Sequence, residues 1–192
     1  MAPAIVFIRH GETDWNAEGR LQGQQDIPLN EVGRLQSAAA GRKLRDIVDP
    51  EALPWLVSPL WRTRETAEIA RAAVGLDPYA YRLDDRLKEL TFGSWEGCTW
   101  KELRAVDPAV VKARAADKWG FVPPQGESYA MLRARIAGWL AEQSQPMIIV
   151  SHGGVARVLL VDLAGWEVQE AASADIWQGK LLWFRAGRAD WI

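Results

Sequence analysis

The sequence predicts an α/β protein of three layers, in which helices cover both faces of a mostly parallel sheet. Short, continuously apolar runs alternate with segments of helical periodicity along almost the whole chain, as in repeated strand-helix units. The apolar runs lack the polar-apolar alternation of a strand with one wet face, so we expect strands buried on both sides. A chain of 192 residues with 48% hydrophobic residues can enclose a substantial core. We therefore expect one domain spanning residues 1–192.

Apolar runs and helix-terminating residues place the individual elements. Strands are predicted at residues 4–8, 53–57, 79–83, 147–150 and 176–184. Helices are predicted at residues 31–48, 59–75, 100–116, 127–142 and 155–163. Asn30 and Ser58 are suited to cap the first two helices, with Pro59 in the first turn of the second. Asp107-Pro108 should interrupt the third helix, and Gly179 should form a bulge in the last strand.

Charge and cysteine content exclude several classes of protein. Lys and Arg number 23 against 25 Asp and Glu, a net charge of −2, which argues against a general nucleic-acid or anionic-membrane binder. No apolar stretch approaches the ~18 residues of a membrane span, and the run from Ile5 to Ile8 is too short for a signal peptide. Cys98 is the only cysteine, so no intramolecular disulfide can form. We expect a cytoplasmic protein, monomeric or homodimeric.

Both histidines of the chain stand directly after predicted strands. The first strand leads into Arg9, His10 and Gly11, and the fourth leads into Ser151-His152-Gly153-Gly154. The second strand is followed within one helical turn by Arg62. Ligands of open α/β sheets bind beyond the carboxyl ends of the strands, where glycines leave backbone N–H groups free for an anion. The sequence therefore predicts an anion-binding pocket that holds both histidines.

Structural roles, zinc binding and serine-hydrolase chemistry fit these residues less well. A single histidine near a turn is more often structural, and Arg62 alone could be a surface residue, but two histidines and two arginines at strand ends favour a functional site. A zinc site needs three or four suitably spaced ligands, which the sequence does not offer. The Gly-x-Ser-x-Gly elbow of a serine hydrolase is absent, as are the glycine-rich phosphate and dinucleotide motifs.

Several motifs in these segments resemble the histidine phosphatase superfamily, the cofactor-dependent phosphoglycerate mutase-like proteins. They appear in family order, at residues 9–16 (RHGETDWN), 20–23 (RLQG), 28–30 (PLN), 58–63 (SPLWRT), 86–90 (RLKEL), 92–97 (FGSWEG), 126–128 (GES) and 151–154 (SHGG). The resemblance implies the phosphoglycerate mutase-like fold. It implies that His10 is the phosphorylated nucleophile and Glu89 the proton donor. It also implies a phosphate pocket made by Arg9, Arg62 and His152, with further contacts from Asn16, Gln22, Gly23 and Gly153.

The chemistry of phosphate transfer explains why these residue types are needed. A neutral imidazole can approach a phosphate dianion once arginines spread its charge, which requires the other N–H of His10 to be held by an acceptor such as a backbone carbonyl. His152 would be more useful as a cation beside the phosphate oxygens. Glu89 must begin protonated to serve the leaving alkoxide, and it can later accept a proton from the attacking water. We expect Glu12 and Glu96 to be structural.

The function predicted from the resemblance is hydrolysis of a small phosphorylated metabolite through a phosphohistidine, without metal or cofactor. A mutase acting on a sugar-acid is the main alternative, but only residues 90–151 separate Glu89 from His152, whereas mutases of this family usually carry a longer insertion. An inactive binding module is the second alternative, although none of the five pocket residues is missing. Residues 99–126 are a candidate cap over the site. Lys101 to Lys118 holds five basic and three acidic residues, which could meet a second anionic group, but a solvated amphipathic helix explains this charge more simply.

Overall fold

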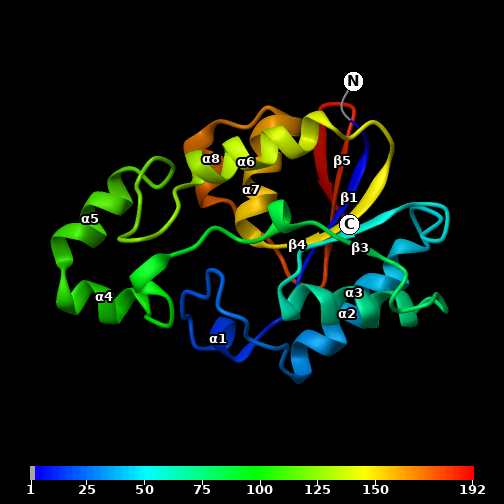
Figure 1. Ribbon diagram of the computed structural model, residues 1–192, viewed down its shortest axis with the longest axis horizontal. Coiled ribbons are helices and arrows are strands. Elements are labelled where there is room, and N and C mark those ends of the chain that lie inside the picture. Colours follow the sequence, from blue (N-terminus) through cyan, green and yellow to red (C-terminus); the bar gives the residue numbers. More distant parts are fainter. Residues whose placement is uncertain (1–2) are drawn as a thin grey trace.

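The computed structural model describes residues 3–192 and has a six-stranded sheet between two layers of helices (Figure 1). The strands are β1 (Ile5–Arg9), β2 (Trp55–Val57), β3 (Arg82–Leu83), β4 (Met147–Ser151), β5 (Leu181–Arg185) and β6 (Arg188–Trp191). Their order across the sheet is β3-β2-β4-β1-β5-β6, with parallel pairing from β3 to β1 and antiparallel pairing from β1 to β6. The predicted fold class, a mostly parallel sheet covered on both faces, is confirmed.

Helices α6, α7 and α8 cover one face of the sheet, and α2 and α3 cover the other (Figure 1). The helices are α1 (Asp14–Ala17), α2 (Glu31–Leu44), α3 (Trp61–Ala72), α4 (Trp100–Val106), α5 (Pro108–Ala116), α6 (Tyr129–Ala141), α7 (Gly153–Ala164) and α8 (Val168–Ser173). As predicted, the chain breaks between α4 and α5 at Asp107, whose side chain caps α5. These two helices lie at one end of the molecule, away from the sheet (Figure 1).

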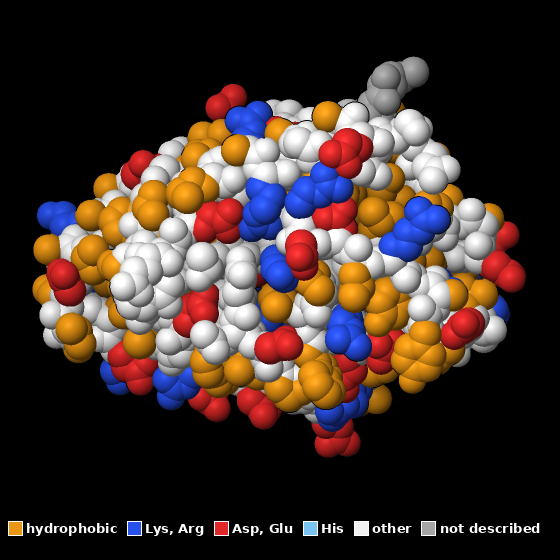
Figure 2. Space-filling view, in the orientation of Figure 1, with side chains coloured by type: hydrophobic (Ala, Val, Ile, Leu, Met, Phe, Trp, Pro, Cys, Tyr) orange, Lys and Arg blue, Asp and Glu red, His pale blue; other side chains and the backbone are white. Residues whose placement is uncertain are grey.

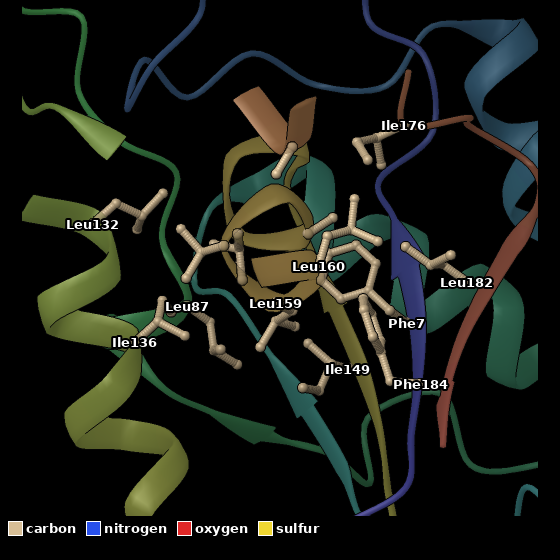
Figure 3. Packing of buried hydrophobic residues seen from close by; sticks show 14 of the residues in the cluster. Phe7, Leu87, Leu132, Ile136, Ile149, Leu159, Leu160, Ile176, Leu182 and Phe184 are labelled. Atoms are coloured by element: carbon tan, nitrogen blue, oxygen red, sulfur yellow. The ribbon is translucent and has the colours of Figure 1, made fainter. Parts of the chain in front are cut away.

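Successive side chains of the central strands are buried on opposite faces of the sheet. In β1, Ile5 and Phe7 join the cluster under α6, α7 and α8, while Val6 and Ile8 join the cluster under α2 and α3. Strand β4 divides its side chains in the same way. Figure 3 shows the first cluster, in which Leu132 of α6 faces the side chains of α7 and the sheet. Because both faces are dry, these strands appear in the sequence as continuous apolar runs.

Two strand predictions were wrong in their extent. The third strand is confined to Arg82–Leu83 rather than 79–83, and both residues are exposed at the edge of the sheet. The last predicted strand, 176–184, begins only at Leu181, and Gly179 lies before it with a φ of 72° instead of forming a bulge within it. A tight turn then leads into β6, which was not predicted from the sequence. Ala186 and Gly187 both have positive φ in this turn, as a two-residue hairpin requires.

The second helix also begins two residues later than predicted. Ser58 does not cap it, because the hydroxyl of Ser58 lies 2.7 Å from Nε2 of His152. The helix starts at Trp61, whose backbone N–H donates to the Asp26 carboxylate at 2.5 Å. This later start places Arg62 in the first turn of α3, at the end of the helix that points to the predicted pocket.

Charges of both signs are mixed on the surface. On the face shown in Figure 2, basic and acidic side chains are interspersed and form no extended field of one sign. Within residues 3–192, no helix has the length and apolar character needed to cross a bilayer. The first described residues, Pro3 and Ala4, lead directly into β1.

Candidate active site

The carboxyl ends of three adjacent parallel strands bring the predicted site residues together. Arg9 ends β1 and pairs with Ser151 at the end of β4, so the residues that follow, His10 and His152, emerge side by side. Their ring centroids are 5.3 Å apart. Backbone hydrogen bonds from His10 N–H to Ser151 O and from Ser58 N–H to Val150 O, both 3.0 Å, fix this edge of the sheet. Residues far apart in the sequence thus meet at the switch point predicted for ligand binding.

His10 is held in one tautomer by its own backbone. Its Nδ1 lies 2.7 Å from the carbonyl oxygen of Gly11, which can only accept a hydrogen bond, so Nδ1 carries the proton and Nε2 is left unprotonated. Burial, and then the charges of Arg62 and Arg9, lower the pKa of His10 well below its ordinary value of 6.5. The backbone acceptor expected from the sequence is therefore present, and it leaves Nε2 with its lone pair free.

His152 is fully buried between the sheet and α7. Its Nε2 is hydrogen-bonded to the Ser58 hydroxyl at 2.7 Å, and its Nδ1 has no hydrogen-bond partner among the described residues. Burial, and then the charge of Arg62, lower the pKa of His152 well below 6.5. The protein groups alone therefore favour a neutral His152. The cationic form expected from the sequence would require the added negative charge of a phosphate dianion.

Arg9 and Arg62 both line the pocket, and each side chain is anchored by hydrogen bonds to the backbone. Arg62 donates to the carbonyls of Gly23 and Gln25, both at 2.7 Å, and Arg9 donates to the carbonyl of Ile176 at 2.6 Å. Burial is the largest cause that lowers the pKa of each guanidinium to about 10, so both arginines stay charged at neutral pH. Two fixed cations beside a neutral imidazole make a site for a dianion.

Glu89 also lines the pocket, shortly after a 3₁₀ turn (Asp85–Leu87) and next to the start of α7. Its Oε2 accepts a hydrogen bond from the backbone N–H of Gly154 at 3.0 Å. A Cβ atom at Gly154 would collide with Oε1 of Glu89, so glycine at this position lets the carboxylate approach the helix. The second glycine of the SHGG motif thus positions the predicted proton donor.

The four predicted contact residues also line the cavity, which has a volume of about 160 Å³. Asn16 uses its Oδ1 to accept from Gln178 and from the backbone of Thr13, which leaves its NH₂ group available to a ligand. Gly23 has a φ of 52°, a conformation that favours glycine, and its carbonyl holds Arg62. Gln22 and Gly153 are buried in the same wall. All of the predicted site residues except His152 line this cavity, and the His152 ring lies next to that of His10.

The structure adds residues to the cavity wall that had no predicted role. They are Arg20, Leu21, Leu90, Phe92, Tyr129 and Arg157. Arg157 stands one helical turn after Gly153, so its spacing could have indicated that it shares the pocket face of α7. Tyr129 comes from the start of α6, and no local pattern connects it with the histidines.

Unpartnered polar atoms concentrate in this pocket. Among residues 3–192, six buried side-chain nitrogen or oxygen atoms lack a hydrogen-bond partner, and four of them belong to predicted site residues: Nε of Arg9, Oε1 of Gln22, Nε of Arg62 and Nδ1 of His152. Native proteins satisfy most buried polar groups, so such a concentration is typical of a site that binds a polar ligand.

The two acids that were expected to be structural accept hydrogen bonds from the backbone and from neighbouring side chains. Glu12 accepts from Asn30, and Glu96 accepts from the backbone of Gln24 and Phe92.

The segment that carries α4 and α5 joins the pocket wall through aromatic contacts. Phe92 of the wall packs edge-to-face against Trp100 of α4, with ring centroids 6.5 Å apart. Trp95 stacks on Phe121 at 5.6 Å, which fastens the far end of this segment. In the part of the chain that the structure describes, no three His, Cys, Asp or Glu side chains are grouped so that they could hold a metal ion.

Known proteins resemble this chain in sequence and in structure over most of its length. A metal-independent phosphoserine phosphatase of Arabidopsis thaliana is 35% identical over 184 residues, covering 93% of this chain and 72% of that protein. A protein of Erwinia tasmaniensis named as a probable phosphoglycerate mutase is 36% identical, covering 84% of this chain and 74% of its own. The solved mycobacterial glucosyl-3-phosphoglycerate phosphatase is 29% identical and superposes with a TM-score of 0.80 over 100% of this chain and 96% of that one.

The family match extends over nearly the whole chain, from residue 5 to residue 191. It matches the histidine phosphatase superfamily (branch 1), and the relatives include proteins named as phosphatases and as probable mutases. Together with the sheet topology and the residues gathered at its carboxyl edge, this match establishes the kind of chemistry: phosphoryl transfer of the histidine phosphatase type. The protein belongs to the histidine phosphatase superfamily.

Proposed function

We propose that this protein is a phosphatase that hydrolyses a small phosphate monoester through a phosphohistidine at His10. The observation that carries the proposal is the 2.7 Å hydrogen bond from Nδ1 of His10 to the Gly11 carbonyl, which leaves Nε2 unprotonated beside two arginines. In the first step Nε2 attacks phosphorus and the bond from phosphorus to the leaving oxygen breaks. In the second step water attacks phosphohistidine, which releases phosphate and restores His10.

Arg9, Arg62 and His152 hold the phosphoryl oxygens in this proposal. Both guanidinium groups have a buried Nε without a hydrogen-bond partner in residues 3–192, and each is held in place by backbone carbonyls through its other nitrogens. His152 has an unpartnered Nδ1 and can gain a proton when the dianion binds, because the negative charge reverses the effect of the nearby arginines. Asn16, Gln22, Gly23 and the Gly153 backbone complete the pocket around the phosphate.

Glu89 serves as the proton donor and, in the second step, as the base. Its carboxylate stands in the cavity wall with His10, Arg9 and Arg62, held by the Gly154 N–H. In its protonated form it can protonate the leaving alkoxide, and the resulting carboxylate can remove a proton from the attacking water. Residues 99–126 would act as a cap, since Phe92 and Trp100 link this segment to the cavity wall.

Hydrolysis is favoured over mutase chemistry by the short segment between Glu89 and His152. Only residues 90–151 lie between them. Apart from α6 and β4, which belong to the layers of the fold, this segment contains just the two short helices α4 and α5. The curated relatives carry both kinds of name, so the assay must separate them. The assay measures phosphate release from sugar-acid phosphates with and without a bisphosphoglycerate primer. A phosphatase should release phosphate in both cases, whereas an isomerised product that forms only with the primer would show that the protein is a mutase.

The His10→Ala variant tests whether the protein is an enzyme of this kind or an inactive binding module. It should eliminate turnover of p-nitrophenyl phosphate, while the melting temperature changes little because His10 contributes a polar ring at a strand end. Wild-type protein without activity on any phosphate ester would support the binding module. A variant that kept a tenth of the wild-type rate would show that His10 is not the nucleophile.

We further propose that the reaction needs neither metal nor cofactor. Arg9 and Arg62 remain charged at neutral pH and supply the positive charge that Mg²⁺ provides in many phosphoryl-transfer enzymes. Exhaustive chelation should therefore leave the hydrolysis rate unchanged. A rate that falls on chelation and returns with zinc or magnesium would contradict this.

The proposed setting is the cytoplasm, and the proposed partner is a small phosphorylated metabolite rather than a nucleic acid or a membrane. The net charge of −2 and the interspersed charges on the face shown in Figure 2 support the choice of partner, because a protein that binds nucleic acid or an anionic membrane needs a basic excess. The cavity volume of about 160 Å³ is smaller than that of pockets for drug-sized ligands, which favours a small ester.

A further inference from the structure

A buried hydrogen bond ties the second histidine of the site to the end of a neighbouring strand. The Ser58 hydroxyl lies 2.7 Å from Nε2 of His152, and both residues are fully buried. The proposed mechanism uses only the other ring nitrogen, Nδ1, and gives Ser58 no role. Ser58 does not line the cavity, so its hydroxyl cannot meet a substrate directly. Any effect of this hydroxyl on the reaction must therefore act through His152.

The backbone of Ser58 is fixed on both sides, which fixes the position of the hydroxyl. Its N–H donates to the Val150 carbonyl of β4 at 3.0 Å, and its own carbonyl accepts from the Thr63 hydroxyl at 2.8 Å. Val57, the last residue of β2, pairs with Val150, which stands two residues before His152. The register of the two strands thus sets the hydroxyl against the imidazole, instead of leaving it to cap α3.

The surroundings of the Ser58 hydroxyl determine the direction of the hydrogen bond. Among residues 3–192, Nε2 of His152 is its only partner. If Nε2 carried a proton and donated, the hydroxyl proton would have no acceptor, and Nδ1 would be a buried lone pair without a donor. If the hydroxyl donates to Nε2, only the Nδ1–H group is left without a partner. The second arrangement leaves fewer unsatisfied buried groups, so it is the more stable one.

We propose that Ser58 is a positioning residue, whose hydroxyl donates to Nε2 and holds neutral His152 in the tautomer that offers Nδ1–H to the phosphoryl group. The inference rests on the proposed phosphatase function, in which Nδ1 contacts the phosphate. Burial and then the charge of Arg62 lower the pKa of His152, so the ring is neutral before the anion binds. An Nδ1–H group attracts a phosphate oxygen, whereas a bare lone pair would repel it.

The same hydroxyl can also serve the cationic ring. When a bound dianion draws a second proton to His152, the proton enters at Nε2, because Nδ1 already holds one. The Ser58 hydroxyl can then turn and accept from Nε2, since a serine hydroxyl both donates and accepts. Ser58 therefore keeps Nδ1–H available to the phosphate in both protonation states.

The tautomer can be measured directly, because the chain has only two histidines. In ¹⁵N NMR of histidine-labelled protein, the chemical shifts distinguish a protonated from an unprotonated ring nitrogen, and the His10→Gln spectrum assigns the remaining ring to His152. The ligand-free wild type should show Nδ1 protonated and Nε2 unprotonated. Ser58→Ala removes the donor, so the ring should populate both tautomers. A wild-type His152 protonated on Nε2 alone would overturn the proposal.

Inorganic phosphate is the probe for binding. In Ser58→Ala, its dissociation constant from calorimetric titration should rise by ~10–10²-fold, the range expected for the loss of a hydrogen bond to a charged group. The KM for p-nitrophenyl phosphate should rise with it. Ser58→Thr keeps the hydroxyl and should stay within ~3-fold of the wild type. Ser37→Ala is the matched control, because Ser37 is also buried and its hydroxyl donates to the Gly33 carbonyl at 2.7 Å. It should leave both the His152 tautomer and the phosphate affinity unchanged.

Two further results would overturn a positioning role for Ser58. One is folded Ser58→Ala with the wild-type tautomer and phosphate affinity. The other is a loss of affinity without a change of tautomer, as a purely structural role requires. The wild-type spectrum tests the tautomer even where Ser58→Ala does not fold. Failure of the proposed function is a different result, in which no phosphate ester is hydrolysed while the tautomer and the phosphate affinity can still be measured.

Discussion

At the scale of single residues, the division of labour between the two histidines follows from what each ring nitrogen contacts. Nδ1 of His10 donates a hydrogen bond to a backbone carbonyl and leaves Nε2 free, whereas Nε2 of His152 is hydrogen-bonded to Ser58. Their residue type is the same, and their hydrogen bonds make one a nucleophile and the other a phosphate ligand in the proposed mechanism.

The role of Glu89 as proton donor predicts a dependence on the leaving group. Glu89→Gln keeps the size of the side chain but cannot transfer the proton, so alkyl and sugar phosphates should be slowed by ~10²–10⁴. An aryl phosphate such as p-nitrophenyl phosphate should lose much less in the first step, because its leaving group departs almost unaided. Single-turnover measurement of phosphoenzyme formation isolates that step. Equal slowing of both classes would mean that Glu89 only positions the pocket.

Much of the site could be predicted at this scale because the chain has only two histidines and both follow buried strands. Glu89 was selected among 25 acidic residues by its place in the family motif rather than by any physical pattern. Arg157 could have been found from its position one helical turn after Gly153 in the same helix. Tyr129 could not, because it reaches the cavity wall through the packing of α6 beside α7, which no local spacing specifies.

At the scale of elements, α3 depends on a cap supplied from a distant loop. Its own N-cap residue, Leu60, makes no side-chain hydrogen bond, and the Trp61 N–H is satisfied by Asp26. Asp26→Ala should therefore destabilise the protein by about 1 kcal/mol and lower the melting temperature by roughly 2–4 °C. Because Arg62 follows in the same turn, KM should rise as well.

The control for this prediction is Asp46→Ala. Asp46 is also exposed, and its side chain makes no hydrogen bond to the described residues. Thermal unfolding and steady-state kinetics of the two variants should differ accordingly. If Asp26→Ala were as stable and as active as Asp46→Ala, the hydrogen bond from Trp61 to Asp26 would not contribute to the stability of the protein.

Sequence patterns predicted best the elements that form long amphipathic or continuously apolar segments. Helices α2, α6 and α7 and strands β1 and β4 lie within one to four residues of their predicted bounds. The short α1 and α8 were not predicted, because four or six residues carry too little periodicity. Strand β6 is half exposed and follows a two-residue turn, so its sequence does not resemble the buried strands beside it.

At the scale of the whole molecule, the order of the strands in the sheet brings the residues of the site together. Strand β4 lies between β1 and β2, and all three end at the same edge, so His10, His152 and Ser58 meet there although they are far apart in sequence. The sequence predicts that these ends converge, but it does not give the order of the strands.

Burial of both histidines predicts how stability changes with pH. Each has a folded-state pKa well below 6.5, so the unfolded chain binds more protons once the pH falls below that value. The contribution of each histidine is fully present above pH 6.5 and is lost as the pH falls toward the folded pKa. Melting temperatures should decline from pH 6.5 downward, and His10→Gln should reduce the decline. An equal decline in wild type and variant would contradict the shift.

The most direct test of the account is to locate the phosphoryl group of the trapped intermediate. The enzyme would be reacted with a phosphate ester, quenched in alkali under denaturing conditions and analysed by ³¹P NMR and peptide mass spectrometry. The structure predicts phosphorylation of His10 on Nε2, because Nδ1 is committed to the Gly11 carbonyl at 2.7 Å. Phosphate found on Nδ1, on His152 or on any other residue, or turnover without a phosphoenzyme, would contradict it.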